Sequence, residues 1–282
     1  MKKINNIIGG IAILFAITFL SSCDEINRPY EEKSGPIDVD TTKKNIIIED
    51  FTGHFCGNCP EAREVAERLT ESYSNVYTIS VHEGPLAKSL PGILKYNWIT
   101  PEATALAQKF KLVASPFGLI NRTAFNGKAL VTPDSWEAAV KAELTKTADI
   151  DINATASFNE TTKEISFIGD IKFLKAGTGK EYLVVYVIED SIVKPQKNDF
   201  LKPFPYDTFY VHKHVLRASM NGNFGEPVSE TIITAGNKVN KSIKYAIPSE
   251  KDWRTNHLDL IAIVRNNETE EILQVEKVKI SK

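Results

Sequence analysis

The sequence predicts an α/β domain followed by an all-β domain. Up to about residue 147, short apolar runs alternate with amphipathic stretches of helical period, which is typical of strands flanked by helices. From about residue 148, apolar and polar residues alternate with a period of two between turn-rich pieces, as in a sandwich-like β domain. A chain of 282 residues is long enough for both, because one domain typically needs ~100–200 residues.

The N-terminus predicts a lipoprotein signal peptide over residues 1–22. Two lysines precede the apolar run Ile7–Leu20, which is shorter than the ~20 residues of a membrane-spanning helix. The run ends in Leu20-Ser21-Ser22-Cys23, which resembles the lipobox of bacterial lipoproteins. That resemblance implies cleavage before Cys23 and a membrane anchor of lipid chains, palmitate among them, on this cysteine. The alternative is an ordinary signal peptide with an incidental cysteine.

Residues 23–43 are polar, mixed in charge and broken by prolines and glycine, and we expect a flexible tether. Loss of Lys2 and Lys3 with the signal peptide would change the formal net charge from −2 to −4. Nothing in this balance indicates a nucleic-acid partner. Export to an oxidising compartment would allow the two remaining cysteines to form a disulfide.

The predicted first domain, residues 44–147, begins with the apolar run Asn45–Phe51, whose consecutive isoleucines predict a strand buried on both faces. A helix follows the two cysteines, because Ala62, Val65, Ala66 and Leu69 repeat at helical spacing. The later expected elements are a strand at Asn75–His82, a helix from Pro101 to about Lys111, an extended segment at Val113–Ile120, its hairpin partner Lys128–Val131 beyond Asn126-Gly127, and a helix from Asp134 to about Lys146.

The predicted second domain, residues 148–282, contains four clear period-two segments. They centre on residues 150–158, 165–173, 243–247 and 258–264. A stretch at about residues 190–225, rich in aromatic residues and prolines, has no such pattern. Connections of this length tend to be functional or mobile.

Cys56 and Cys59 form a C-x-x-C motif at the junction of a predicted strand and helix, which is typical of a thiol–disulfide site. The positive end of the helix dipole stabilises a thiolate, lowering a thiol pKa from ~8.5 to roughly 3.5–7.5. Cys56 is then the attacking thiol and Cys59 the resolving one. A structural zinc site needs four ligands, and no second C-x-x-C exists, so we expect neither metal nor cofactor.

Three features resemble proteins of the thioredoxin fold: Cys56-Gly57-Asn58-Cys59, Asp50 upstream, and Ser115-Pro116 downstream. The resemblance implies a thioredoxin-like domain in which Asp50 is a buried carboxylate that accepts the proton of the resolving thiol. It also implies that Pro116 is a cis-proline whose loop faces the disulfide. Asp50 could instead be an exposed carboxylate at the end of its strand. Asn58 stands where the family usually has proline, and Phe55 where it has tryptophan.

Four histidines are candidate modulators or ligands. His54 could polarise Cys56 as an imidazolium, or be a solvated loop residue; His82 ends a strand, where ligands bind in open α/β sheets. On a strand His212 and His214 would point to the same side, as metal ligands or as contacts between domains, and we expect the second.

The segments Glu49–His54, Tyr210–Arg217 and Asn221–Glu226 resemble the twenty-eight-kilodalton outer-membrane lipoprotein family of Bacteroidetes. That resemblance implies an exported lipoprotein, held at the outer membrane through its lipid. Two functions stay open. One is a thiol–disulfide oxidoreductase acting on exported protein thiols and disulfides. The other is a surface binding or adhesion protein for an unknown ligand, with a structural disulfide.

Overall fold

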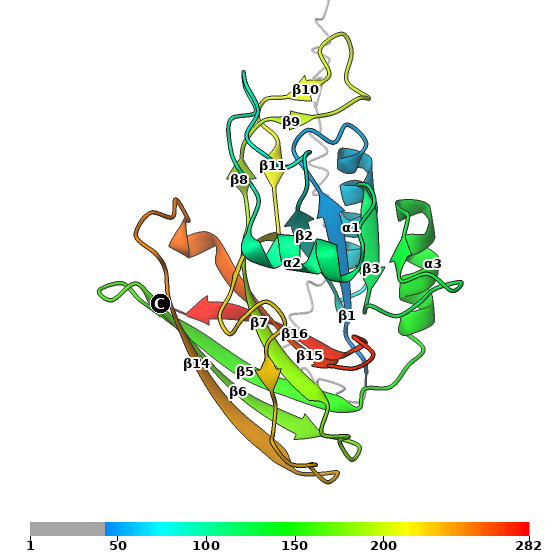
Figure 1. The fold of residues 1–282 in the computed structure, drawn as a ribbon, viewed down its shortest axis with the longest axis vertical. Coiled ribbons are helices and arrows are strands. Elements are labelled where there is room, and N and C mark those ends of the chain that lie inside the picture. The colour runs from blue at the N-terminus through cyan, green and yellow to red at the C-terminus, as the bar shows by residue number, and fades with distance from the viewer. Residues whose placement is uncertain (1–42, 282) are drawn as a thin grey trace, which may run out of the picture. The chain divides into compact units, whose positions relative to one another are not determined.

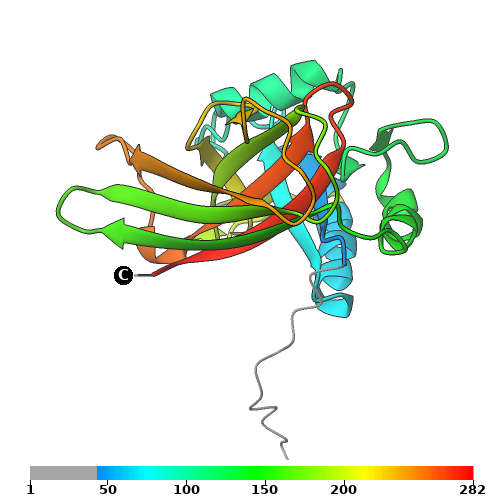
Figure 2. The same cartoon turned by 90° about the horizontal axis from the view of Figure 1, so that it is seen from below.

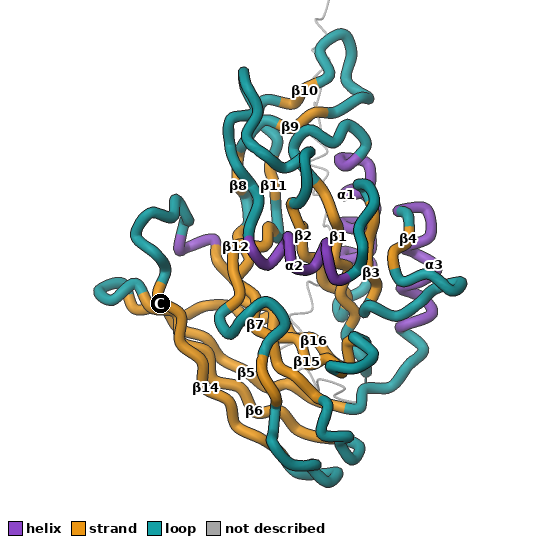
Figure 3. The backbone as a smooth tube through the Cα atoms, in the orientation of Figure 1, coloured by secondary structure: helices purple, strands orange, loops and turns teal. Residues whose placement is uncertain are grey.

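Residues 43–281 are described by the computed structural model of the chain (Figure 1). The predicted signal peptide, the lipid site Cys23 and all of the tether but Lys43 lie outside the described residues. The described part is a mixed α/β fold, with one large, mostly β sheet and few helices (Figure 3).

The first strand, β1 (Ile46–Thr52), is buried along its whole length, as predicted from its isoleucines. Ile46 and Ile48 pack on the side of helices α1 (Cys59–Ser72) and α3 (Pro133–Glu143). Ile47 and Phe51 pack on the opposite side, with helix α2 (Pro101–Lys109). The alternating direction of side chains along a strand therefore covers both faces of β1 with helices.

The strands around β1 follow the predicted order. It pairs in parallel with β2 (Val76–His82) and antiparallel with β3 (Phe117–Ile120), which is joined by β4 (Leu130–Val131). The turn between β3 and β4 contains Asn126 and Gly127, both with positive φ. The predicted start of α2 is also confirmed, since the Thr100 hydroxyl accepts a hydrogen bond from the Ala103 amide at 3.1 Å.

The four period-two segments are strands, namely β5 (Ile150–Asn159), β6 (Glu164–Phe173), β14 (Lys238–Ala246) and β15 (Leu258–Asn266). Two further long strands, β7 (Glu181–Glu189) and β16 (Ile272–Ser281), lack clean alternation. Nearly every residue of β7 is buried, so its sequence is an apolar run rather than an alternating one. β5, β6 and β14 extend away from α1 and α3 (Figure 2).

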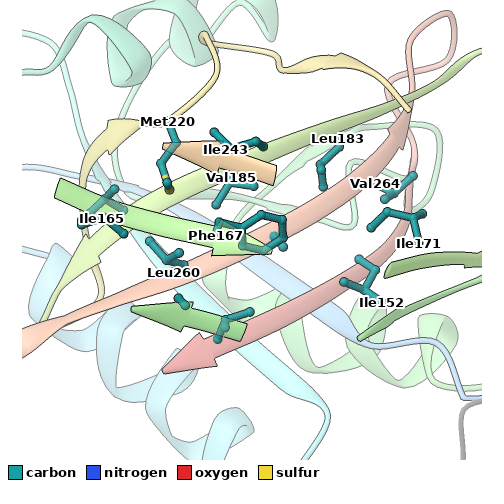
Figure 4. Packing of buried hydrophobic residues seen from close by; sticks show 14 of the residues in the cluster. Ile152, Ile165, Phe167, Ile171, Leu183, Val185, Met220, Ile243, Leu260 and Val264 are labelled. Atoms are coloured by element: carbon teal, nitrogen blue, oxygen red, sulfur yellow. The ribbon is translucent and has the colours of Figure 1, made fainter. Parts of the chain in front are cut away.

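Side chains from β5, β6 and β14 share one apolar cluster with side chains from β7 and β15 (Figure 4). Phe167 of β6 lies at its centre, fully buried among residues of the other strands. The opposite side of β7 contributes Val184 and Tyr186 to the cluster that also contains α2 and Ile47. The central strands of the sheet are therefore buried on both sides.

The stretch at residues 190–225 contains five short strands: β8 (Ile192–Val193), β9 (Gln196–Lys197), β10 (Tyr206–Asp207), β11 (Val211–His212) and β12 (Val215–Ser219). β12 lies between β7 and β2, and β13 (Glu226–Pro227) pairs with β7. The sheet therefore runs without a break in the order β14-β6-β5-β16-β15-β7-β12-β2-β1-β3-β4. Strands on both sides of the predicted domain boundary at residues 147–148 belong to it, and the boundary itself stays a prediction.

Candidate functional site

The two cysteines form a disulfide with an S–S distance of 2.04 Å. Cys56 lies in the loop after β1, and Cys59 is the first residue of α1, with Pro60 in the first turn as expected. The sulfur atoms thus lie at the helix end that carries a partial positive charge, which stabilises a thiolate there after reduction.

A hairpin from the second half of the chain lies on the C-x-x-C loop. This cover hairpin, Gln196–Asp207, consists of β9, β10 and their connection, and it lies beyond the end of β1 (Figure 1). Its Lys197 amide donates a hydrogen bond to the His54 carbonyl at 2.8 Å, and its Asp199 amide donates to the Gly57 carbonyl at 3.0 Å. The Gln196 side-chain amide donates to the Cys56 carbonyl at 2.9 Å.

The Asp199 side chain of the hairpin lies directly against the glycine inside the motif. A Cβ atom on Gly57 would lie 2.0 Å from the Asp199 carboxylate, closer than any real contact. Beneath the hairpin, Cys56 is 4% exposed and Cys59 is 3% exposed. A folded substrate therefore cannot reach either sulfur atom while the hairpin is in this position.

Asp50 is buried, with 2% of its surface exposed, so the alternative of an exposed strand-end carboxylate is wrong. Burial raises the pKa of Asp50 to about 7, and the nearby Arg63 guanidinium opposes this only in part. Its Oδ1 atom has no hydrogen-bond partner among the described residues. Asp50 and Cys59 line the same small cavity, so the carboxyl group lies beside the predicted resolving cysteine.

His54 is buried, and both of its ring nitrogens have partners. The Trp98 indole N–H donates to His54 Nδ1 at 3.0 Å, so Nε2 carries the proton and donates to the Lys88 carbonyl at 2.7 Å. Burial also lowers the pKa of His54. Of the two alternatives for His54, an imidazolium beside Cys56 does not fit this neutral ring, and a solvated loop residue does not fit its burial.

His82 lies at the site, as its position at the end of β2 predicted. It stacks on Trp98 with ring centroids 4.5 Å apart, and His212 lies 4.3 Å from the same indole. His82 and His212 are 3% and 2% exposed, and both line the cavity that contains Asp50 and Cys59. Burial lowers the pKa of His82 to about 3 and that of His212 well below its usual range, so both rings are neutral.

His212 and His214 do not share a side, contrary to the expectation for a strand. β11 ends at His212, and His214 has a φ of 53°, which turns the chain. His214 instead pairs with Asp190, with 3.1 Å between Nδ1 and Oδ1. Only His212 therefore belongs to the site.

Pro116 follows a cis peptide bond, as the resemblance to thioredoxins implied. It directly precedes β3, whose Phe117 is paired with Phe51 near the end of β1. The loop thus lies at the edge of the sheet where β1 leads into the C-x-x-C loop, and its role toward the disulfide stays a prediction.

Four side chains at the site escaped the sequence analysis. Arg63 and Tyr210 line the cavity, Gln196 holds the C-x-x-C loop, and the Trp98 indole packs on the rings of His82 and His212. They come from a helix surface and two loops far apart in sequence, so spacing alone gave no signal.

Within residues 43–281, no group of three or more His, Cys, Asp or Glu is arranged to hold a metal ion. The helices in this range are also too short or too polar to cross a membrane.

Solved structures with a similar fold include HBP35 of Porphyromonas gingivalis, with a TM-score of 0.65 and 18% identity over 86% of this chain and 76% of that chain. A protein from Agrobacterium tumefaciens has a TM-score of 0.50 and 14% identity, covering 82% of this chain and 92% of that one. A domain of the outer membrane lipoprotein Omp28 from Porphyromonas gingivalis is 24% identical, with a TM-score of 0.32, over 48% of this chain and 89% of that chain.

No curated protein matches this sequence. The sequence model of the family described as "Outer membrane protein Omp28" matches residues 103–282, which is more than half of the chain. The chain therefore belongs to the Omp28 family of outer membrane proteins, as its sequence segments indicated.

Proposed function

We propose that this outer-membrane lipoprotein is a thiol–disulfide oxidoreductase, with a thioredoxin-like region that carries the site and a sandwich-like β region that covers it. The observation that carries the proposal is Asp50, a buried carboxyl group with a pKa of about 7 beside Cys59. A merely structural disulfide has no need of a buried acid that titrates near neutral pH. The order of β1, α1, β2, β3, β4 and α3 supports the thioredoxin-like part.

The chemistry follows from this placement. A substrate thiolate attacks Cys56 Sγ, the Cys56–Cys59 bond breaks, and Cys59 leaves with the electron pair. The Asp50 carboxylic acid gives its proton to the Cys59 sulfur. A second thiolate of the substrate then attacks the substrate sulfur of the mixed disulfide and releases Cys56 as a thiolate. The substrate ends as a disulfide, oxidised by two electrons, and the reverse steps reduce a substrate disulfide.

Turnover requires the cover hairpin to move, since Cys56 is 4% exposed beneath it. Only a few hydrogen bonds hold the hairpin on the C-x-x-C loop, and each is worth about 1 kcal/mol net. Its connection carries the exposed side chains of Phe200, Leu201 and Phe204. The proposal therefore includes a substrate-accessible state in which the hairpin has left the loop.

A second candidate function is a surface binding protein with a structural disulfide, the β region and its loops contacting the ligand. The burial of both cysteines favours it, because a disulfide that never opens needs no access. In that case Cys56 and Cys59 only fix the start of α1 beneath the cover hairpin.

Two measurements on the purified full-length protein distinguish the oxidoreductase from the binding protein with a structural disulfide. They are a redox titration against glutathione or dithiothreitol and an insulin-reduction assay. An oxidoreductase has a potential between about −120 and −270 mV, and Cys56→Ser abolishes its activity. A potential below about −300 mV, with no activity lost in Cys56→Ser, would favour the structural disulfide.

The predicted anchor is tested by metabolic labelling with a fatty acid. Label is expected on the wild-type protein and absent from Cys23→Ala. Label that persists in this variant would show that another residue carries the lipid.

A further inference from the structure

Three buried polar atoms around one cavity have no hydrogen-bond partner among the described residues. They are Asp50 Oδ1, His82 Nδ1 and His212 Nε2. Each belongs to a side chain that is at least 97% buried. An unpaired polar atom in such a place costs about 1–3 kcal/mol, so three around one cavity need a physical reason.

The cavity has the size and lining of a site for one water molecule. Its volume is about 10 Å³, which is close to the smallest space that holds a water. A buried water typically makes about three hydrogen bonds. Three unpaired atoms therefore match one water, whereas the space is too small for an organic ligand.

The charged groups around the cavity favour neutral histidines. Arg63 of α1 and Arg217 of β12 act on His82, and Arg63 also acts on His212. His54, from the loop before α1, is itself neutral. Tyr210 also lines the cavity, and burial raises its pKa to about 12, so it is neutral as well. The negative charges of Glu67 and Glu64 on α1 raise the pKa of Tyr210 in the same direction.

Neutral rings can accept hydrogen bonds at the two unpaired nitrogens. A water in the cavity would accept a hydrogen bond from the Asp50 carboxylic acid and donate its two hydrogens to His82 Nδ1 and His212 Nε2. Once Asp50 has lost its proton, the same water can turn and donate to the carboxylate. Such a charge-assisted bond is roughly twice as strong as a neutral one.

We propose that His82 and His212 hold one water molecule against Asp50, and that they thereby act as positioning residues for the proton that Asp50 exchanges with the Cys59 sulfur. This rests on the proposed function. The proton leaves the Asp50 carboxyl group and binds the Cys59 thiolate formed when the disulfide breaks, so charge and protons balance. The water and the two histidines are unchanged by the step.

The test is a titration of the Asp50 carboxyl carbon, followed by carbon-13 NMR in the oxidised full chain. The variant His82→Leu/His212→Leu removes both partners of the water, and the carboxylate loses its hydrogen bond. The titration midpoint of Asp50 is then expected to rise by about one pH unit or more. The matched control His214→Leu changes the same chain segment outside the cavity, and is expected to leave the midpoint in place.

A second variant keeps the hydrogen bonds and replaces the rings. In His82→Asn/His212→Gln, the amides place polar atoms near the positions of Nδ1 and Nε2, so the midpoint is expected to return toward the wild-type value. A wild-type midpoint in the leucine variant would overturn the proposal, as would an equal shift in the Asn/Gln variant, which would indicate altered packing alone.

The rate of disulfide reduction by dithiothreitol is measured against pH in the same variants. Its inflection is expected to move with the Asp50 midpoint and to vanish in Asp50→Asn. Insulin reduction by the same proteins is measured in a separate assay. If the wild-type protein reduces insulin, but the leucine variant has the same pH profile of disulfide reduction as the wild-type protein, this inference alone is overturned. A protein that never turns over insulin, but shows the shifted midpoint, would overturn only the proposed function.

Discussion

At the scale of single residues, the site depends on a carboxyl group that is buried, where its charged form is unfavourable. Asp50 lies on the side of β1 that faces α1, where a residue such as Ile48 packs into the apolar core. Its burial favours the neutral form, which is why its pKa is raised to about 7. The same burial that makes Asp50 useful for proton transfer therefore costs folding stability whenever it is ionised.

Asp50→Asn is expected to stabilise the protein at alkaline pH. Because the folded-state pKa is raised from 3.8, Asp50 contributes its full stability only below about pH 4 and loses it as the pH rises to 7. Urea unfolding at pH 4 to 8 should therefore show that the variant has the larger free energy of unfolding. The difference from the wild-type protein should grow over this pH range, up to about 4 kcal/mol. The control is the Asp134→Asn variant, which changes an exposed carboxylate. A stability difference between Asp50→Asn and the wild-type protein that is the same at all pH values would show that burial does not raise the pKa of Asp50.

At the scale of elements, the cover hairpin decides whether the disulfide can be reached. It contacts the C-x-x-C loop through backbone groups and Gln196, and it packs directly on Gly57. Glycine at this position permits the close approach, since any side chain would meet Asp199. The motif and the hairpin are thus complementary in shape, although they lie far apart in sequence.

Gly57→Ala is expected to push the exposed Asp199 carboxylate away from the C-x-x-C loop and to speed reduction of the disulfide by dithiothreitol by at most about tenfold, the effect of losing up to about 1.4 kcal/mol of hairpin contacts. The double variant Gly57→Ala/Asp199→Gly removes the atoms that the new methyl group meets, and should restore the slow rate. If both variants are equally fast, the methyl group acts on the disulfide itself and not through the hairpin.

At the scale of the whole molecule, the two halves of the chain share one sheet, and a buried arginine of the first half lies near a carboxylate of the second. β12 joins β7 to β2, and Arg122 binds Glu49 with two hydrogen bonds of 2.7 and 2.8 Å. Both side chains are fully buried, and Arg122 also lies 3.7 Å from Glu270 near the C-terminal strands. The N-terminal strands are therefore held to the C-terminal part by charge as well as by packing.

Glu49→Ala is expected to destabilise the protein by about 3–5 kcal/mol, because it removes the carboxylate that binds the buried Arg122 guanidinium and leaves the more distant Glu270 carboxylate, at 3.7 Å. Chemical denaturation followed by circular dichroism measures this. The control is Glu137→Ala, which breaks the exposed pair with Lys141 and should leave the free energy of unfolding almost unchanged. A similar small cost for both variants would show that the buried pair is dispensable.

The sequence could predict the parts of this molecule that local patterns determine. Three local patterns each predict which side chains of one element are buried: the isoleucines of β1, the helical spacing after Cys59, and the alternation in β5 and β6. The course of residues 190–225 depends instead on pairing with distant partners, such as Val215 with Ser80. The cysteines are predicted from their motif and Asp50 from the resemblance to thioredoxins, whereas Trp98 and Gln196 reach the site through contacts between segments far apart in sequence.

The position of the cover hairpin also has a consequence for the order of events during secretion. The Gln196 side chain lies 140 residues after the Cys56 carbonyl that it binds. Since a chain emerges from its N-terminus, Cys56 and Cys59 leave the export channel well before the hairpin exists. During that interval no hairpin lies on the C-x-x-C loop, and the thiols are open to the oxidants of the envelope. We expect the bond to form on the emerging chain, and the second half of the protein to close over a disulfide already made.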